Sequence, residues 1–181
     1  SMSEPEVQAL AEYCLNHGNI KAQIDFHAFS QLILEPRGYT TELPPDWDEL
    51  HALGGKMSEA IGSVYGEFYV HDNPCNILYC ASGTLIDWPY DTYQSKAYCI
   101  ELRPSSGGVG GFDPSPSEIL PCAQENFEAA KVLISDAAQK LLISFPNGIP
   151  SLVSTIEETS FDVIIEPRNE DPMEETGLIY L

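Results

Sequence analysis

The sequence has few basic residues. Eight lysines and arginines stand against 28 aspartates and glutamates in 181 residues, for a formal net charge of −20. Without a basic cluster, the chain lacks the electrostatic footprint that nucleic acid or an anionic membrane requires, so we expect neither as a partner. Long apolar runs are also missing, so we expect neither a membrane span nor a targeting peptide. The apolar share of 43% is nevertheless enough for a globular core.

Several motifs of catalysis and metal binding are absent as well. There is no phosphate loop of the GKS or GKT type, no G-x-S-x-G nucleophile elbow, and no HxxE or HExxH zinc helix. The five cysteines are odd in number and include no CxxC pair. We interpret them as buried thiols with one disulfide at most.

The pattern that is present predicts strands alternating with long helices. Alternating apolar residues predict strands at 22–29 and 96–103, and a 3.6-residue period predicts helices after residue 4, at 47–64 and at 121–143. This order is typical of an open α/β sheet covered by helices on both faces. Ser3 and Glu6 have the spacing of a capping box at the first helix. The last helix is expected to bury the apolar positions Ala123, Phe127, Ala130 and Ile134.

Residues 144–181 differ from the rest, with eight acids and one base. We interpret them as an acidic C-terminal extension of unknown role that contains a strand-like run at 161–165.

Two side chains stand out as candidates for chemistry. His27 lies near the end of the first predicted strand, on the same face as Asp25, and Glu101 lies on the apolar strand 96–103. Ligands of open α/β sheets bind outside the carboxyl ends of strands, where both residues fall. The alternatives are a structural histidine and a surface pair of Glu101 with Arg103. The other histidines are expected to be solvated on helices (His17, His51) or in a turn (His71).

Three sequence blocks then point to a family. They are the stretch from Ser3 to Leu32 with the core His27-Ala28-Phe29-Ser30-Gln31, the stretch Tyr79-Cys80-Ala81-Ser82-Gly83 with Ile86-Asp87-Trp88, and the stretch Ile100-Glu101-Leu102-Arg103 followed by Phe112 and Ile119-Leu120-Pro121. In order and spacing they resemble the C-terminal half of the catalytic domain of zinc metallocarboxypeptidases of the carboxypeptidase A type. The resemblance covers roughly residues 2–143. It implies a mixed, mostly parallel sheet that is incomplete at its N-terminal side.

The resemblance implies a role for each matching position. His27 matches the third zinc ligand, and Glu101 matches the carboxylate that acts as general base on the attacking water and then as proton donor to the leaving amine. Tyr79 matches the tyrosine that closes over the substrate's C-terminal carboxylate. Ile86 matches the base of the pocket for the terminal side chain, where an isoleucine implies apolar or aromatic C-terminal residues. Ala28-Phe29 and Pro104 depart from the family's usual residues.

The expected function is therefore zinc-dependent removal of apolar or aromatic residues from peptide or protein C-termini. A catalytic zinc needs about three protein ligands, and residues three positions after the four histidines are Ile20, Ser30, Gly54 and Pro74, so no HxxE supplies the other two. The chain alone is expected to be inactive, and a separate chain with the N-terminal half of the domain is the expected partner. The alternative is a catalytically incompetent relative that binds peptides or proteins or serves a structural role. The resemblance also implies an extracellular or secreted protein.

Overall fold

The protein is described from a computed structural model that covers residues 3–17, 19–138, 141–144 and 164–167. Residues 1–134 and 135–181 form two compact units. The first unit holds a four-stranded sheet in the order β1-β4-β2-β3. Its strands are β1 (Ala22–Ala28), β2 (Leu32–Leu34), β3 (Val70–Asp72) and β4 (Lys96–Leu102). The pairs β1–β4 and β2–β3 are parallel, and β2–β4 is antiparallel. The predicted mixed, mostly parallel α/β sheet is confirmed.

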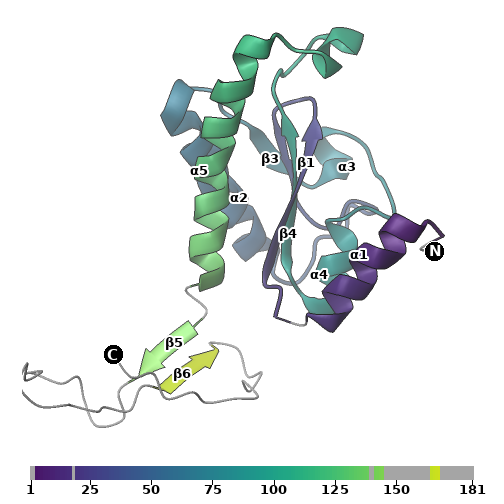
Figure 1. The fold of residues 1–181 in the computed structure, drawn as a ribbon, viewed down its shortest axis with the longest axis vertical. Coiled ribbons are helices and arrows are strands. Elements are labelled where there is room, and N and C mark those ends of the chain that lie inside the picture. Colours follow the sequence, from purple (N-terminus) through teal and green to yellow (C-terminus); the bar gives the residue numbers. More distant parts are fainter. Residues whose placement is uncertain (1–2, 18, 139–140, 145–163, 168–181) are drawn as a thin grey trace, which may run out of the picture. The chain divides into compact units, whose positions relative to one another are not determined.

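Helices lie on both faces of this sheet, as Figure 1 shows: α2 and α5 on one side, and α1, α3 and α4 on the other. Their bounds are α1 (Pro5–Asn16), α2 (Trp47–Tyr65), α3 (Pro74–Ile77), α4 (Asp87–Tyr93) and α5 (Ile119–Ala138). Two 3-10 turns, Gly108–Phe112 and Pro116–Glu118, precede α5. The capping-box prediction is wrong, because the N-cap of α1 is Glu4 and no side chain caps this helix.

The second unit contains a two-stranded antiparallel sheet of β5 (Leu141–Ser144) and β6 (Ile164–Pro167). The predicted helix at 121–143 is therefore too long, since α5 ends at Ala138 and a strand follows. The strand-like run at 161–165 overlaps β6 by two residues. Most of the proposed extension, including 145–163 and 168–181, lies outside the described residues.

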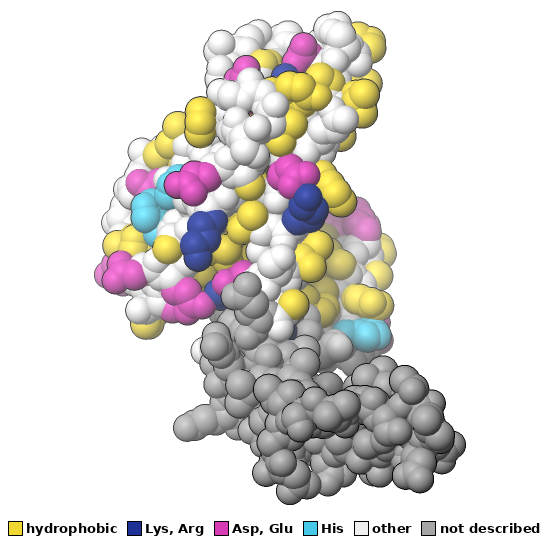
Figure 2. All heavy atoms as spheres, turned by 90° about the vertical axis from the view of Figure 1, so that its left-hand side faces the viewer, with side chains coloured by type: hydrophobic (Ala, Val, Ile, Leu, Met, Phe, Trp, Pro, Cys, Tyr) yellow, Lys and Arg dark blue, Asp and Glu magenta, His cyan; other side chains and the backbone are white. Residues whose placement is uncertain are grey.

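Helix α5 buries a different face from the one that its apolar period predicts. Its buried residues within the first unit are Glu125, Asn126, Ala129 and Leu133, whereas Phe127 and Ile134 are exposed. Figure 2 looks onto the side of α2 and α5 and shows hydrophobic side chains at the surface among acidic and a few basic ones. Part of this surface is an apolar groove of about 530 Å³, lined by Phe26, Leu102, Ile119, Ala123 and Phe127 among others.

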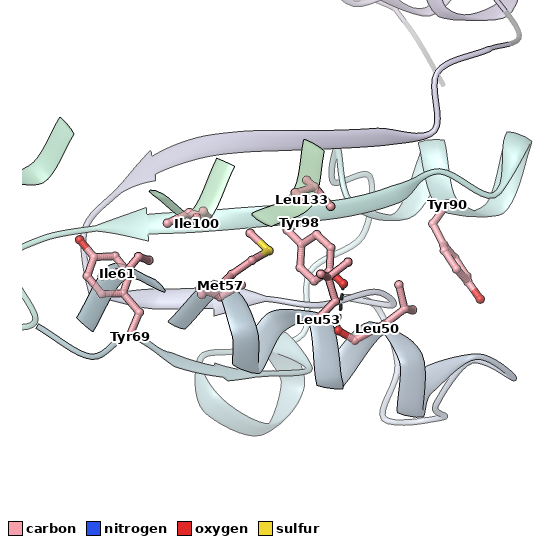
Figure 3. Packing of buried hydrophobic residues seen from close by; sticks show 11 residues of the cluster. Leu50, Leu53, Met57, Ile61, Tyr69, Tyr90, Tyr98, Ile100 and Leu133 are labelled. Atoms are coloured by element: carbon pink, nitrogen blue, oxygen red, sulfur yellow. Dashed lines mark hydrogen bonds between the residues drawn. The ribbon is translucent and has the colours of Figure 1, made fainter. Parts of the chain in front are cut away.

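The main core fills the space between the sheet and helices α2 and α5. Tyr98 and Ile100 of β4 point from the sheet onto Leu50, Leu53, Met57 and Ile61 of α2 and Leu133 of α5 (Figure 3). The Tyr98 hydroxyl donates to the Leu50 carbonyl at 2.9 Å, so the buried phenol has an acceptor. The same pleat turns alternate β4 residues, Ala97 and Cys99, to the opposite face, where they pack with Ile86. This second face carries the candidate site.

Candidate active site

The two candidate catalytic side chains lie on adjacent parallel strands. In the register of β1 with β4, His27 is paired with Glu101. Both stand near the carboxyl ends of their strands, the edge at which ligands bind in open α/β sheets. The structure thus brings together two residues that are 74 positions apart in the sequence.

All four predicted site residues line one cavity of about 750 Å³. His27 and Glu101 form its sheet side, and Tyr79, Ile86 and residues of α1 contribute further walls. Ile86 is 2% exposed and belongs to the apolar cluster beneath the sheet, whereas Tyr79 is 65% exposed. A cavity with apolar and aromatic walls and a few polar groups is the usual form of a small-ligand site.

The His27 side chain is oriented by its neighbour Asp25. The Nε2 atom of His27 lies 2.9 Å from Asp25 Oδ2, and the imidazole is half exposed. A carboxylate at one ring nitrogen fixes the ring and leaves the other nitrogen, here Nδ1, for a metal. The donor set at this place therefore fits one histidine ligand of a zinc ion.

A cysteine completes the group of possible metal ligands at this strand edge. The ligand atoms of Asp25, His27 and Cys99 lie within 4.8 Å of one another. Burial raises the pKa of Cys99 to about 12, with smaller contributions from Glu101 and Asp25. Because the thiolate is the form that binds a metal, this rise makes Cys99 a weaker candidate ligand than His27.

Glu101 is half-buried in the cavity wall, and this position changes the pKa of its carboxyl. Burial raises the pKa of this carboxyl above its ordinary value, the charge of Asp25 adds to the rise, and His27 opposes it. A carboxylate that is partly desolvated is a stronger proton acceptor than one in water, which suits a general base. The predicted surface pair of Glu101 with Arg103 is wrong. Arg103 turns to the other face of the sheet, where it donates to Glu118 and to the buried Glu125.

Sequence reasoning missed the groups that hold the wall around Ile86. Asp87 is buried at the start of α4 and accepts hydrogen bonds from the Gly38 amide at 2.7 Å and from the Thr84 hydroxyl at 2.8 Å. Burial raises the pKa of Asp87, and both hydrogen bonds oppose that rise. The disulfide Cys75–Cys80 closes the loop that ends beside Tyr79 and confirms the expectation of one disulfide. No spacing signal in the sequence pairs Gly38 with Asp87, which are 49 positions apart.

One histidine prediction is wrong, because His71 lies in β3 and not in a turn. His51 lies on α2 and is partly exposed, as predicted, but no signal in the sequence indicated that His51 and His71 both contact Glu35. They lie outside the cavity that holds His27.

The fold and this cavity define an α/β domain with a histidine, a carboxylate and a substrate-sized hollow at the sheet edge. The family model described as zinc carboxypeptidase matches residues 1–129. The chain therefore belongs to the zinc carboxypeptidase family, whose members carry a zinc ion. Among the described helices, none is long and apolar enough to cross a membrane.

Individual relatives agree with the family assignment. The chain is 35% identical over 139 residues to carboxypeptidase A4 of Mus musculus, a match that covers 77% of this chain and 33% of that protein. It is 40% identical over 127 residues to carboxypeptidase A1 of Sus scrofa, a match that covers 70% of this chain and 30% of that protein. It is similar to the structure of bovine thrombin-activatable fibrinolysis inhibitor in complex with a tick carboxypeptidase inhibitor (TM-score 0.71, 32% identity, 76% of this chain and 46% of that one). For carboxypeptidase A of Helicoverpa armigera, the TM-score is 0.66 at 31% identity, over 76% of this chain and 35% of that one. The chain thus spans about one third of the length of these curated relatives.

Proposed function

We propose that this chain contributes the third zinc ligand, His27, and the general base, Glu101, to the active site of a zinc carboxypeptidase. The observation that carries the proposal is the register of β1 with β4, which sets the two side chains beside each other on one cavity wall. Family membership supplies the chemistry that such a pair serves.

In this proposal the residues of the chain divide the work. When bound, zinc acts as a Lewis acid that polarises a carbonyl and makes water a better nucleophile. Glu101 takes the proton of the attacking water and delivers it to the nitrogen of the leaving amino acid, so that the C–N bond breaks with a neutral amine. Asp25 holds the imidazole of His27 in one orientation. Tyr79, exposed at the cavity edge, closes over the terminal carboxylate of the peptide.

The side-chain preference follows from the wall at Ile86. This residue is buried and continuous with an apolar cluster, so this wall of the cavity offers no charge to a basic terminal residue. Burying apolar side-chain surface there stabilises the complex by about 25 cal/mol per Å². We therefore propose apolar or aromatic C-terminal residues as substrates.

The remaining zinc ligands come, in this proposal, from a polypeptide segment outside these 181 residues. Within the described residues, His27 is the one histidine that lines the cavity, and the carboxylate of Asp25 is hydrogen-bonded to its imidazole. The apolar groove beside the edge strand β1 supports a packing partner, because contiguous exposed apolar surface is typical of interaction sites. The partner is the N-terminal part of the same type of domain. Residues 144–181 are proposed as an added acidic segment, and the disulfide Cys75–Cys80 supports an extracellular or secreted location.

The test uses the assembled enzyme and a peptide that ends in phenylalanine. Glu101→Gln should lower kcat at least about a thousandfold, by removing the base, without loss of metal. The matched control is Glu59→Gln, an exposed position on α2 that should keep full activity. Near-normal turnover in Glu101→Gln would end the assignment of the base. Peptide binding without hydrolysis in the wild type would instead favour the non-catalytic alternative.

The pocket assignment has its own test. Ile86→Asp should move the preference toward peptides that end in lysine or arginine, whereas Ile86→Val should keep the preference for phenylalanine. The measurement is the ratio of kcat/KM for the two kinds of peptide. An unchanged ratio in a folded Ile86→Asp enzyme would contradict the role of this residue.

A further inference from the structure

A second cluster of possible metal ligands lies away from the cavity of His27. Glu35 directly follows β2 and is fully buried. Its Oε2 atom lies 2.9 Å from Nδ1 of His51 on α2, and its Oε1 atom lies 3.0 Å from Nδ1 of His71 in β3. The ligand atoms of the three residues lie within 4.8 Å of one another. Three separate elements therefore direct three donor atoms to one point.

Helix α2 is shaped around this cluster. It has two consecutive glycines in its interior, Gly54 and Gly55, which are unfavourable in a helix. A Cβ atom at Gly54 would lie 2.1 Å from Glu35 Oε1 and 3.3 Å from His71 Nδ1, and a Cβ at Gly55 would lie 3.4 Å from His71 Nε2. The carboxylate of Glu35 occupies the space that a side chain at position 54 would need. This close approach explains why a helix-weakening glycine stands at position 54, where the hydrophobic core does not require one.

The charge balance at the cluster favours a cation. A carboxylate removed from water is costly unless it is paired. In the described part of the chain, the polar side-chain partners of Glu35 are the two histidines, and no lysine or arginine is among them. Trp47 stacks on His51 at a ring distance of 5.1 Å and covers the imidazole from the N-terminal side of α2. A divalent ion held between the carboxylate and the two imidazoles would balance the charge of this buried carboxylate.

We propose that Glu35, His51 and His71 form a second metal site, for a divalent ion of the zinc class, separate from the peptidase cavity. One carboxylate and two imidazoles are a common donor set for Zn²⁺, with Zn–N and Zn–O distances of about 2.0–2.2 Å. Tetrahedral ligands at that range are about 3.3–3.5 Å apart, so the two histidine–carboxylate distances, now 2.9 and 3.0 Å, need to lengthen by only a few tenths of an ångström.

The open side of the cluster supplies the remaining coordination. The side chains of His51 and His71 are 42% and 25% exposed, so water reaches the ion while Glu35 holds it from the buried side. In the metal-bound form each ring carries its proton on Nε2. A site with three protein ligands and water is exchangeable rather than permanently closed.

The proposal is tested by metal binding in a chain whose peptidase ligand has been removed. His27→Ala eliminates the strongest donor of the cavity, so metal retained by this variant belongs to the second site. Equilibrium dialysis against Zn²⁺ should give one ion per chain in His27→Ala. His27→Ala/His51→Gln and His27→Ala/His71→Gln should bind Zn²⁺ at least about a hundredfold more weakly, since losing a ligand costs more than losing a supporting contact.

A matched control and a spectroscopic readout make the result specific. His17 is an exposed histidine of the C-terminal end of α1, and His27→Ala/His17→Gln should bind Zn²⁺ as tightly as His27→Ala. Co²⁺ in place of Zn²⁺ should give the intense visible bands of a four- or five-coordinate ion, and these bands should vanish in the His51 and His71 variants.

Two outcomes would overturn the proposal. One is no tight Zn²⁺ binding by His27→Ala, and the other is equal binding in the His51→Gln and His71→Gln variants, which would leave a hydrogen-bonded triad only. Both histidines are partly exposed, so these variants are expected to fold, and circular dichroism checks that they do. The result is independent of the peptidase proposal, because a failure at His27 or Glu101 leaves the metal count of the second site unchanged.

Discussion

The two neighbouring glycines of α2 allow a sharp test of the buried carboxylate. In the interior of a helix, glycine to alanine ordinarily stabilises by about 0.8–1 kcal/mol. Gly55→Ala should show this gain, because its Cβ would make an ordinary van der Waals contact with His71 at 3.4 Å. Gly54→Ala should not, because its Cβ would lie 2.1 Å from Oε1 of Glu35, which is fully buried.

The size of the loss follows from what the carboxylate must give up. To make room for the methyl group of Gly54→Ala, Glu35 has to leave its contacts with His51 and His71. Hydrogen bonds to a charged group are worth about 1.5–3 kcal/mol each, so losing two costs at least about 3 kcal/mol. After the helical gain of about 1 kcal/mol, Gly54→Ala should lower the free energy of unfolding by about 2 kcal/mol or more.

The assay is urea unfolding followed by circular dichroism, in the presence of a chelator so that no metal contributes. The expected difference between the two alanine variants is about 3 kcal/mol, or more than a hundredfold in the folding equilibrium. A Gly54→Ala protein as stable as Gly55→Ala would refute the reasoning, because the carboxylate would then not occupy the space beside position 54.

Two further predictions concern the electrostatics of the fold. Glu125→Gln should lower the free energy of unfolding by about 3 kcal/mol, because it breaks a buried ion pair with Arg103. The control is Glu118→Gln, whose side chain is half exposed and whose loss should lower the free energy of unfolding by about 1 kcal/mol or less. Equal losses in urea unfolding would contradict the burial of the pair of Glu125 with Arg103. The raised pKa of Asp87 means that the folded state holds its proton more tightly than the unfolded state. This stabilisation is complete below the ordinary pKa of about 3.9 and is lost as the pH rises through the folded-state pKa. The stability of the wild type relative to Asp87→Asn should therefore increase as the pH is lowered from 7 toward 4, and a constant difference in urea unfolding would contradict it.

Long periodic segments of this fold were predictable, and short ones were not. The strands β1 and β4 and the helix α2 alternate or repeat over at least seven residues, so their patterns stand out from the sequence. The strands β2 and β3 have three residues each and are fixed by pairing with β4 and with each other, which no local pattern records. The buried face of α5 was missed for a related reason. Its apolar stripe lines the exposed groove, while the buried Glu125 and Asn126 bond to Arg103 and Tyr69.

The functional residues likewise include some that could be predicted from the sequence and some that could not. His27, Glu101, Tyr79 and Ile86 were found through family blocks whose order and spacing are visible along the chain. The partners of Glu35 were not, because His51 and His71 are 16 and 36 residues away and follow no metal-ligand spacing. Such a cluster exists only once β2, α2 and β3 have been brought together by the core.

The central claim is that this chain holds one zinc ligand of a composite peptidase site. The most direct measurement is native mass spectrometry of the purified material, with metal content, for the wild type and His27→Ala. We expect a mass above the 19.9 kDa of this chain, with a zinc count that falls by one in His27→Ala. A lone 19.9 kDa chain with the same zinc count in both proteins, or with none, would contradict it.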